Sequence, residues 1–296
     1  MLTLESLSTL LKPHPEAAQA MVAPFSLSGR TFEFGRAKAV MGVVNLSADS
    51  WYRESVCLSL DRALRRARVL TAQGADIIDV GAESTLAHAA RVDESSQSVK
   101  IVPFVKELRS EGILVSVETY DSQVAKKVLE AGASVINLTG KAESAEIYRA
   151  AASHDAGVII CYVQGTHVRE VEDFDLAANP IEVAQAYFER EIEKARAAGL
   201  TRIFIDPGLG FYYRNLQDST LRIRHQMNMF LNSFRLRALG YPICHALPHA
   251  FEHFGEEVRA AEGFFAVLAA LGKTDLFRTH EVPQVKAVLQ TLEVYG

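Results

Sequence analysis

Short apolar runs rich in β-branched residues alternate along the chain with longer stretches in which apolar residues recur at helical spacing. The short runs are apolar on both faces, which is typical of strands buried on both sides in a parallel sheet. Eight strands are expected, at Ala39–Leu46, Ala75–Gly81, Ile113–Thr119, Ser134–Thr139, Val158–Val163, Arg202–Asp206, Pro242–Leu247 and Asp275–His280.

A helical stretch follows each expected strand, and Gly74, Gly132 and Gly199 stand where the residue after a helix should be. Eight strand-helix repeats predict an α/β fold, a (β/α)8 TIM barrel. An open doubly wound sheet is the alternative, but it would leave edge strands of more polar character than these. The expected helices are Leu58–Gln73, Ser96–Ser110, Asp121–Ala131, Ala142–His154, Pro180–Ala198, Asp218–Leu239, Glu256–Leu271 and Pro283–Val294.

The segment ahead of the first strand has a different pattern. Residues Phe25–Phe34 alternate apolar and polar side chains on both sides of Ser28-Gly29, which predicts a β-hairpin that closes the barrel bottom. The residues before it, through Pro15, are expected to form a short helix outside the barrel. We therefore divide the chain into an N-terminal helix and hairpin extension, residues 1–36, and a barrel, residues 37–296.

Composition narrows the class of partner. The 296 residues are 49% apolar and 23% charged, with a net charge of −5 and no block of like charge. This balance argues against nucleic acid or an anionic membrane surface and favours a small molecule. No apolar stretch reaches membrane-spanning length, and the N-terminus lacks a signal-peptide pattern. Three widely spaced cysteines are expected to be reduced thiols in a cytoplasmic protein.

Polar residues close several of the expected strands. In a parallel barrel the carboxyl ends of all strands open on the active-site face, so a polar residue there points at a ligand. A ring of amides and carboxylates suits a ligand that carries several donors and acceptors in one plane, such as a reduced pterin. Strands one to four end on Asn45, on Asp79 with Glu83, on Glu118 and on Asn137.

Two later strands add an acid and a pair of bases. Residues Ile205–Phe211 read Ile-Asp-Pro-Gly-Leu-Gly-Phe. The apolar run of the strand ends on Asp206, and a turn follows. Arg278 and His280 lie two apart at the end of strand eight, so both side chains are expected on one face, where they would bind an anion. The alternative for Arg278 is a surface ion pair with Glu281 or a loop acid.

Other polar residues have simpler interpretations. Asp121 and Asp218 precede helices and are expected to be N-caps. His245, His249 and His253 are spaced four apart, which on a helix would suggest a metal site, but a strand end and a turn interrupt the segment. A metal site there is therefore disfavoured.

Longer motifs carry a resemblance. Residues Met41–Trp51 read Met-Gly-Val-Val-Asn-Leu-Ser-Ala-Asp-Ser-Trp, and Gly74–Thr85 read Gly-Ala-Asp-Ile-Ile-Asp-Val-Gly-Ala-Glu-Ser-Thr. They resemble the first two strands of the dihydropteroate synthase family, the pterin-binding barrel enzymes of folate synthesis. The resemblance runs from about Phe25 to the C-terminus and continues through Val115–Asp121, Ala131–Asn137, Gln164–Thr166, Asp206–Phe211, Gly240–Pro242 and Arg278–His280.

This resemblance implies a set of roles. Glu118, Asn137 and Asp206 would hold a pterin, and Asn45, Arg278 and His280 would hold the diphosphate that leaves it. Mg²⁺ would bridge Asn45 and the diphosphate as cofactor, and the protein would be a homodimer. His249, Arg278 and His280 are the implied catalytic residues, and the substrate-binding set is completed by Asp79, Thr85, Gln164, Phe211 and His249.

The departures from the family pattern fall mainly on the side of the second substrate. The family's Ser-Arg-Lys-Ser-Phe becomes Leu247-Pro-His-Ala-Phe251, so His249 replaces a lysine and Leu247 a serine. Glu118 replaces the family's aspartate. Three hypotheses are open: a dihydropteroate synthase-like transferase using p-aminobenzoate or another acceptor, a pterin-dependent methyltransferase, and a non-catalytic pterin-binding paralogue.

Overall fold

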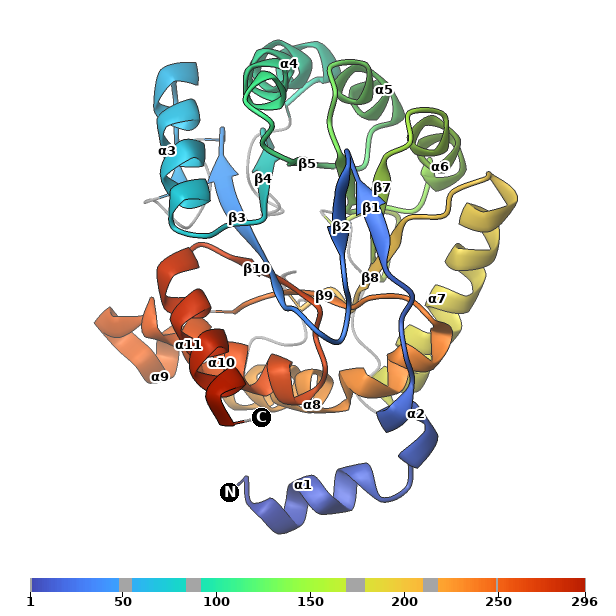
Figure 1. Cartoon of the computed structure of the whole chain (residues 1–296), viewed down its shortest axis with the longest axis vertical. Helices are drawn as coiled ribbons and strands as arrows, with labels where there is room; N and C mark the ends of the chain where they lie inside the picture. Colours follow the sequence, from blue (N-terminus) through green and yellow to red (C-terminus); the bar gives the residue numbers. More distant parts are fainter. Residues whose placement is uncertain are drawn as a thin grey trace.

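The computed structural model describes residues 2–47, 55–83, 92–168, 179–209, 218–248 and 250–295 (Figure 1). Eight parallel strands pair in the order β8-β7-β6-β5-β4-β3-β10-β9. The outermost two, β8 and β9, meet at a parallel bridge between Ile205 and Ile243. The sheet thus closes into the predicted barrel. Its strands are β3 (Ala39–Asn45), β4 (Ile77–Gly81), β5 (Val115–Thr119), β6 (Val135–Leu138), β7 (Gly157–Cys161), β8 (Ile203–Asp206), β9 (Cys244–Ala246) and β10 (Leu276–Thr279).

Helices cover the outside of the barrel, as predicted. Gly74, Gly132 and Gly199 have φ values of 103°, 101° and 84°, which fit the left-handed residue after a helix. Asp121 and Asp218 cap α5 and α8 through their side chains, as predicted. The helices after the strands include α3 (Leu60–Ala72), α4 (Glu94–Ser110), α5 (Ser122–Glu130), α6 (Ser144–Ser153), α7 (Pro180–Ala197), α8 (Ser219–Asn232), α10 (Ala260–Leu271) and α11 (Val282–Tyr295).

Two expected helices are divided. The stretch predicted over Asp218–Leu239 ends its α-helical part at Asn232 and continues as the 3-10 helix η3 (Ser233–Leu239). At that junction the Ser233 hydroxyl donates to the carbonyl of Met229 at 2.7 Å, a side-chain bond that competes with the helix backbone. The stretch predicted from Glu256 consists of η4 (Gly255–Glu257) and then α10, with α9 (Phe251–Phe254) before them.

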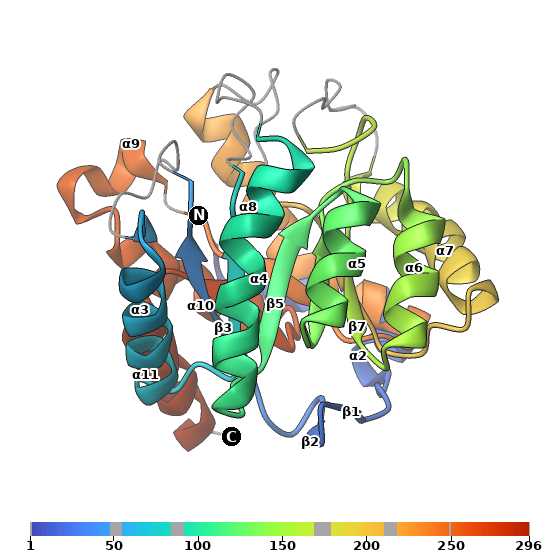
Figure 2. The ribbon, with the colours of Figure 1, turned by 90° about the horizontal axis from the view of Figure 1, so that it is seen from above.

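The N-terminal hairpin closes the bottom of the barrel, as predicted. Strands β1 (Phe25–Leu27) and β2 (Arg30–Phe32) pair antiparallel, and Leu27, Phe32 and Phe34 are buried in one cluster with side chains of the barrel interior. Figure 2 shows the hairpin at one end of the barrel and β5 running away from it. The polar ends of the strands therefore lie at the opposite end.

The segment before the hairpin holds two short helices rather than one. Helix α1 (Leu4–Leu11) stops before Pro15, and α2 (Pro15–Gln19) begins there. Proline is favoured at the first helical position because its missing N–H needs no partner there. The division of the chain at residue 36 stays a prediction.

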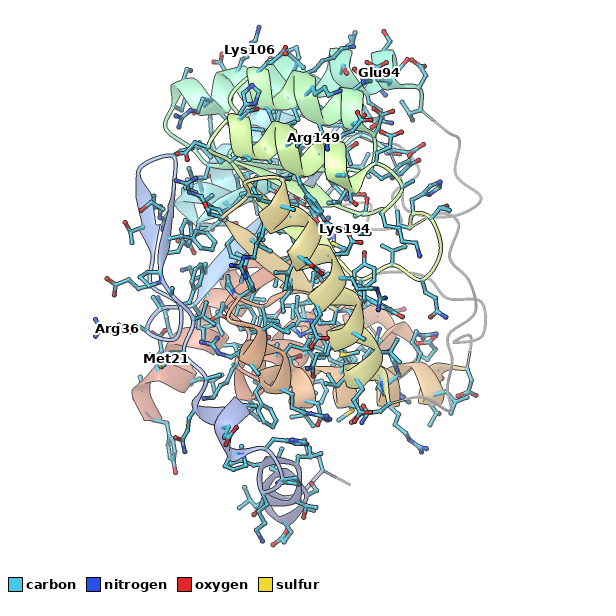
Figure 3. The ribbon with its side chains drawn as sticks, turned by 90° about the vertical axis from the view of Figure 1, so that its right-hand side faces the viewer. Met21, Arg36, Glu94, Lys106, Arg149 and Lys194 are labelled. Atoms are coloured by element: carbon cyan, nitrogen blue, oxygen red, sulfur yellow. The ribbon has the colours of Figure 1, made fainter. Side chains whose placement is uncertain are left out.

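Two basic residues of the barrel hydrogen bond to this extension, and one of them belongs to a buried ion pair. Arg237 of η3 donates to Asp275 at 2.6 Å, and their side chains are 3% and 0% exposed. Arg237 also donates to the carbonyl of Ala20, and Lys273 donates to the carbonyl of Ala18. Figure 3 shows Met21 and Arg36 at the hairpin end of the molecule and Glu94 at the other. Within the described residues, no helix is long and apolar enough to cross a membrane.

Candidate active site

The mouth of the barrel gathers polar side chains from the carboxyl ends of five strands. These side chains are Asp79 of β4, Glu118 of β5, Asn137 of β6, Asp206 of β8 and Arg278 of β10. Strand register places Glu118 opposite Asn137 and Cys161 opposite Asp206. The prediction that polar strand ends lie together is thereby realised in the fold.

An ion pair occupies the centre of this group. Arg278 Nε lies 2.7 Å from Asp79 Oδ2, with side chains 19% and 0% exposed. Asp79 also accepts from the Ser116 hydroxyl at 2.7 Å and from Asn137 Nδ2 at 3.3 Å. Burial works to lower the pKa of Arg278, but the charges of Asp79 and Glu118 outweigh it and raise that pKa above its usual value. The site therefore carries a permanent cation.

The partner of Arg278 differs from the alternative that the sequence left open. A surface pair of Arg278 with Glu281 is wrong, because Arg278 pairs with Asp79 inside the mouth. Glu281 pairs with Arg259 at 2.6 Å instead. Arg278 and Asp79 lie 199 residues apart in the sequence. Their side chains meet only because the barrel closes, so the sequence gave no hint of this contact.

Glu118 of β5 leans toward the neighbouring strand β4. Its Oε1 accepts from the Thr139 hydroxyl at 3.1 Å. A Cβ on Gly81 would lie 2.8 Å from Glu118 Oε2, so the carboxylate occupies space that only glycine leaves open. Burial raises the pKa of Glu118 to about 7, with Arg278 opposing the shift and Asp79 adding to it. Glu118 can thus change charge near neutral pH.

Two thiols support the side chains of Asn137 and Asp206. Cys161 Sγ donates to Asn137 Oδ1 at 3.2 Å, and the thiol of Cys244 is hydrogen bonded to Asp206. Burial raises the pKa of both thiols well above the usual value, so they keep their protons and act as donors. The sequence predicted reduced thiols but gave no sign of these two contacts.

Asp206 itself is almost fully buried. It accepts from the backbone N–H of Gly208 at 2.8 Å. Burial raises the pKa of Asp206 to about 6, and the Gly208 hydrogen bond opposes that shift. At neutral pH the carboxylate is mostly ionised and can accept two hydrogen bonds in one plane.

His280 lies just past the end of β10 and pairs with a helix. Its Nδ1 lies 2.9 Å from Glu262 Oε1, and the Glu262 side chain is fully buried. Thr279, between Arg278 and His280, donates its hydroxyl to the same carboxylate. No pattern in the sequence singled out Glu262, because a buried acid on a helix is recognisable only from its partners in space.

Other predicted site residues lie near the strand ends. Asn45 Nδ2 donates to the Ser55 hydroxyl. Gln164 Oε1 accepts from Tyr162 at 3.5 Å, and Glu83 accepts from the Tyr120 hydroxyl at 2.6 Å. Thr85, Phe211 and His249, which the sequence also assigned to the site, lie outside the described residues.

Asn45 is the residue that could hold a metal with the substrate. With Nδ2 donating to Ser55, Oδ1 is the atom that Asn45 could offer a cation. Among the described residues no cluster of three or more His, Cys, Asp or Glu side chains could bind a metal by itself. One amide oxygen fits Mg²⁺ that arrives with a diphosphate, because this ion usually takes few protein ligands and keeps phosphate oxygens.

The fold and the site together define an α/β-barrel protein whose polar groups converge at the carboxyl ends of its strands, the arrangement of barrel enzymes. Residues 41–247 match the family model described as pterin binding enzyme, and the chain belongs to this family. The resemblance to dihydropteroate synthases found in the sequence is thereby confirmed.

Several curated relatives of this chain are named dihydropteroate synthase. The chain is 30% identical over 202 residues to dihydropteroate synthase from Synechocystis sp., covering 67% of this chain and 70% of the relative. It is 27% identical over 267 residues to dihydropteroate synthase from Bacillus subtilis, covering 86% and 87%. It is also 32% identical to a folate synthesis bifunctional protein from Arabidopsis thaliana, over 61% of this chain. The chain spans only 39% of that bifunctional relative's length.

Solved structures agree on the fold. Dihydropteroate synthase from Yersinia pestis, in complex with a sulfonamide drug, superposes with a TM-score of 0.78 at 23% identity, covering 92% of this chain and 98% of that one. Dihydropteroate synthase from Clostridium difficile, in the presence of pteroic acid, gives a TM-score of 0.76 at 26% identity, with coverage of 89% and 98%.

Proposed function

We propose that the protein is a dihydropteroate synthase-like transferase. It joins a nucleophile, p-aminobenzoate or another acceptor, to the methylene of a 6-hydroxymethyl-dihydropterin diphosphate with loss of diphosphate. The observation that carries this proposal is the convergence of Asp206, Asn137 and Glu118 with the partly buried cation of Arg278 at the mouth of the barrel. Relatives that match most of this chain are named dihydropteroate synthases, which supports it.

The two acids and the amide would bind the pterin. The 2-amino group and N3–H of the pterin are adjacent donors, and a carboxylate accepts such a pair with two oxygens. Asp206 offers that carboxylate, fixed by Gly208 and supported by Cys244. Asn137 is held by Cys161 and Asp79, so it meets the ligand without rotating. A pre-set site binds with less loss of side-chain entropy.

Arg278 would stabilise the departing group. In the reaction the carbon–oxygen bond to the diphosphate breaks and its electron pair leaves with the diphosphate. The new bond forms from the lone pair of the acceptor, which then loses a proton. Negative charge grows on the leaving oxygen, and a cation that is already in place lowers the barrier because nothing must reorganise. Asp79 holds Arg278 in that place through Nε.

The acceptor side is where this chain departs from the family pattern. Leu247, which stands in place of the family's serine, is buried and has no hydrogen-bonding side chain. The carboxylate of p-aminobenzoate would therefore lack a partner at this position. We propose that turnover with p-aminobenzoate is slow and that a less polar acceptor nucleophile is used faster.

Mg²⁺ would accompany the diphosphate as cofactor. Asn45 Oδ1 would be its protein ligand, and the ion would neutralise charge on the leaving group.

We also propose that the protein is a cytoplasmic homodimer. The three cysteines are free and buried, which fits a reducing compartment. Phe264 and Leu271 lie seven residues apart on α10, are 43% and 51% exposed, and face the same side. A second copy of the chain would cover them. In analytical ultracentrifugation the wild type should sediment as a dimer and Phe264→Glu as a monomer. A monomeric wild type would contradict this part of the proposal.

Pterin binding and diphosphate release test the main proposal. Calorimetry with a reduced pterin should show Asp206→Ala weakened by roughly 1.5–3 kcal/mol, because a charge-assisted hydrogen bond is lost. Asp61→Ala, which removes an exposed acid on α3, should bind as the wild type does. A coupled assay should detect diphosphate release from the pterin ester with an amine acceptor. Equal pterin affinity in Asp206→Ala would show that the site lies elsewhere.

A further inference from the structure

Glu262 organises the end of β10 from the neighbouring helix α10. Its carboxylate accepts from the backbone N–H groups of His280 and Glu281 at 3.0 and 3.2 Å. It also accepts from the Thr279 hydroxyl and from His280 Nδ1, the latter at 2.9 Å. The Glu262 side chain is fully buried and that of His280 is 10% exposed. Four donors from three consecutive residues therefore converge on one buried acid.

We infer that Glu262 is a positioning residue that fixes the tautomer of His280, with the proton on Nδ1 and with Nε2 as the ring atom that meets the substrate. In a neutral imidazole one nitrogen donates and the other accepts, and the partner of each nitrogen decides which. An ionised carboxylate can accept hydrogen bonds but cannot donate them, so Nδ1 must be the donor in this contact. The hydrogen bonds from the backbone N–H groups of His280 and Glu281 to Glu262 fix the backbone that carries the ring.

The other charged groups of this region have partners of their own. Arg259, just before α10, holds Glu281 at 2.6 and 2.8 Å. Arg278, two residues before His280, pairs with Asp79 at 2.7 Å. Glu262 is thus the acid assigned to His280, while the two arginines are each bound to a different carboxylate.

A fixed tautomer has a consequence for anion binding, and this step rests on the proposed function. When the ring is neutral, Nε2 carries a lone pair and cannot donate to a diphosphate oxygen. When the ring takes up a proton, Nε2–H becomes a donor aimed along a direction that Glu262 has already set. The diphosphate therefore binds the charged ring and is released by the neutral one. Without Glu262, the neutral ring could place its hydrogen on Nε2 and still donate.

Nitrogen NMR of protein labelled in its histidines tests the inference directly. His280 is assigned from the signal that disappears in His280→Gln. At alkaline pH, where the ring is neutral, wild type should show a protonated Nδ1 and an unprotonated Nε2. Glu262→Gln should shift His280 toward the Nε2–H tautomer. Glu281→Gln is the matched control, because it removes a neighbouring carboxylate of the same loop and should leave the tautomer unchanged.

Inorganic diphosphate is the probe for the second step. Its affinity for wild type should fall about tenfold or more as the ring loses its proton, and Glu262→Gln should flatten this dependence. An Nε2–H tautomer in wild type would overturn the inference, and this measurement needs no folded Glu262 variant. If the Nδ1–H tautomer is found but diphosphate binding ignores both His280→Gln and Glu262→Gln, the positioning role is upheld and the anion site of the proposed function fails.

Discussion

Glu118 is a residue of the mouth whose charge changes near neutral pH. Its pKa is raised from 4.5 to about 7, chiefly by burial. The folded protein therefore binds this proton more tightly than the unfolded chain does. Its contribution to stability is complete below about pH 4.5 and is lost as the pH rises through about 7. The ligand-free enzyme thus holds a charge at alkaline pH that weakens the fold.

We expect Glu118→Gln to raise the free energy of unfolding at about pH 8 by about 1–3 kcal/mol, and to leave it nearly unchanged at about pH 4.5. Denaturant unfolding without ligand at both pH values measures this. The exposed acid of Glu107 provides the control, because Glu107→Gln should change stability little at either pH. The prediction fails if Glu118→Gln is destabilising at alkaline pH.

Cys161 supports Asn137 through a single sulfur donor. We expect Cys161→Ala to weaken pterin binding several-fold, because the amide of Asn137 loses the partner of its Oδ1. Cys161→Ser should recover part of the loss, since its hydroxyl is also a donor. Cys57→Ala removes another buried thiol and should bind normally. Calorimetry compares the four proteins, and equal affinity in all of them would exclude this role.

The sequence predicted the strand-end residues of the site but not the contacts among them. Asp79, Glu118 and Asp206 were recognisable because each ends an apolar run. Ser116 could have been found as well, since it lies two residues before Glu118 on the same face of β5. The Cys161 and Glu262 contacts could not, because neither thiol polarity nor a buried helix acid leaves a periodic signal.

At the scale of elements, η3 depends on one buried ion pair. We expect Arg237→Met to lower the free energy of unfolding by about 3–5 kcal/mol, because it leaves the Asp275 carboxylate buried without its cation. The more exposed pair of Arg222 with Glu252, whose side chains are 27% and 43% exposed, gives the control, and Arg222→Met should cost under about 1 kcal/mol. Urea unfolding decides between them. Equal costs for the two substitutions would mean that the buried pair contributes nothing special.

Element order followed from the sequence while element ends did not. The strand and helix alternation is encoded in apolar periodicity, and it is sampled over many residues. The break between α8 and η3 rests on Ser233, whose hydroxyl turns back to the carbonyl of Met229. Such a side-chain bond depends on the rotamer of one residue, which periodicity does not report.

Considered as a whole, the molecule separates its structural end from its chemical end. Phe34 packs in the cluster at the hairpin end, and the site lies at the opposite end. We expect Phe34→Ala to lower the free energy of unfolding by about 3–5 kcal/mol while leaving pterin affinity unchanged. Met21→Ala, at an exposed side chain of the same end, should be nearly neutral. Thermal unfolding and calorimetry test the pair, and a parallel loss of pterin affinity would contradict the separation.

The number of backbone contacts between neighbouring strands is not the same around the barrel. Every neighbouring pair of strands is laced by a ladder except β8 and β9, which share the bridge at Ile205 and Ile243 within the described residues. Asp206 and Cys244 each follow one residue of that bridge and are hydrogen bonded to each other. A pterin held by Asp206 would therefore stabilise the strand pair with the fewest backbone contacts. Amide hydrogens along β9 should then exchange with solvent faster than those of β5 in the empty protein, and binding should slow them more than any others. Ligand binding would thus strengthen the closure of the barrel between β8 and β9.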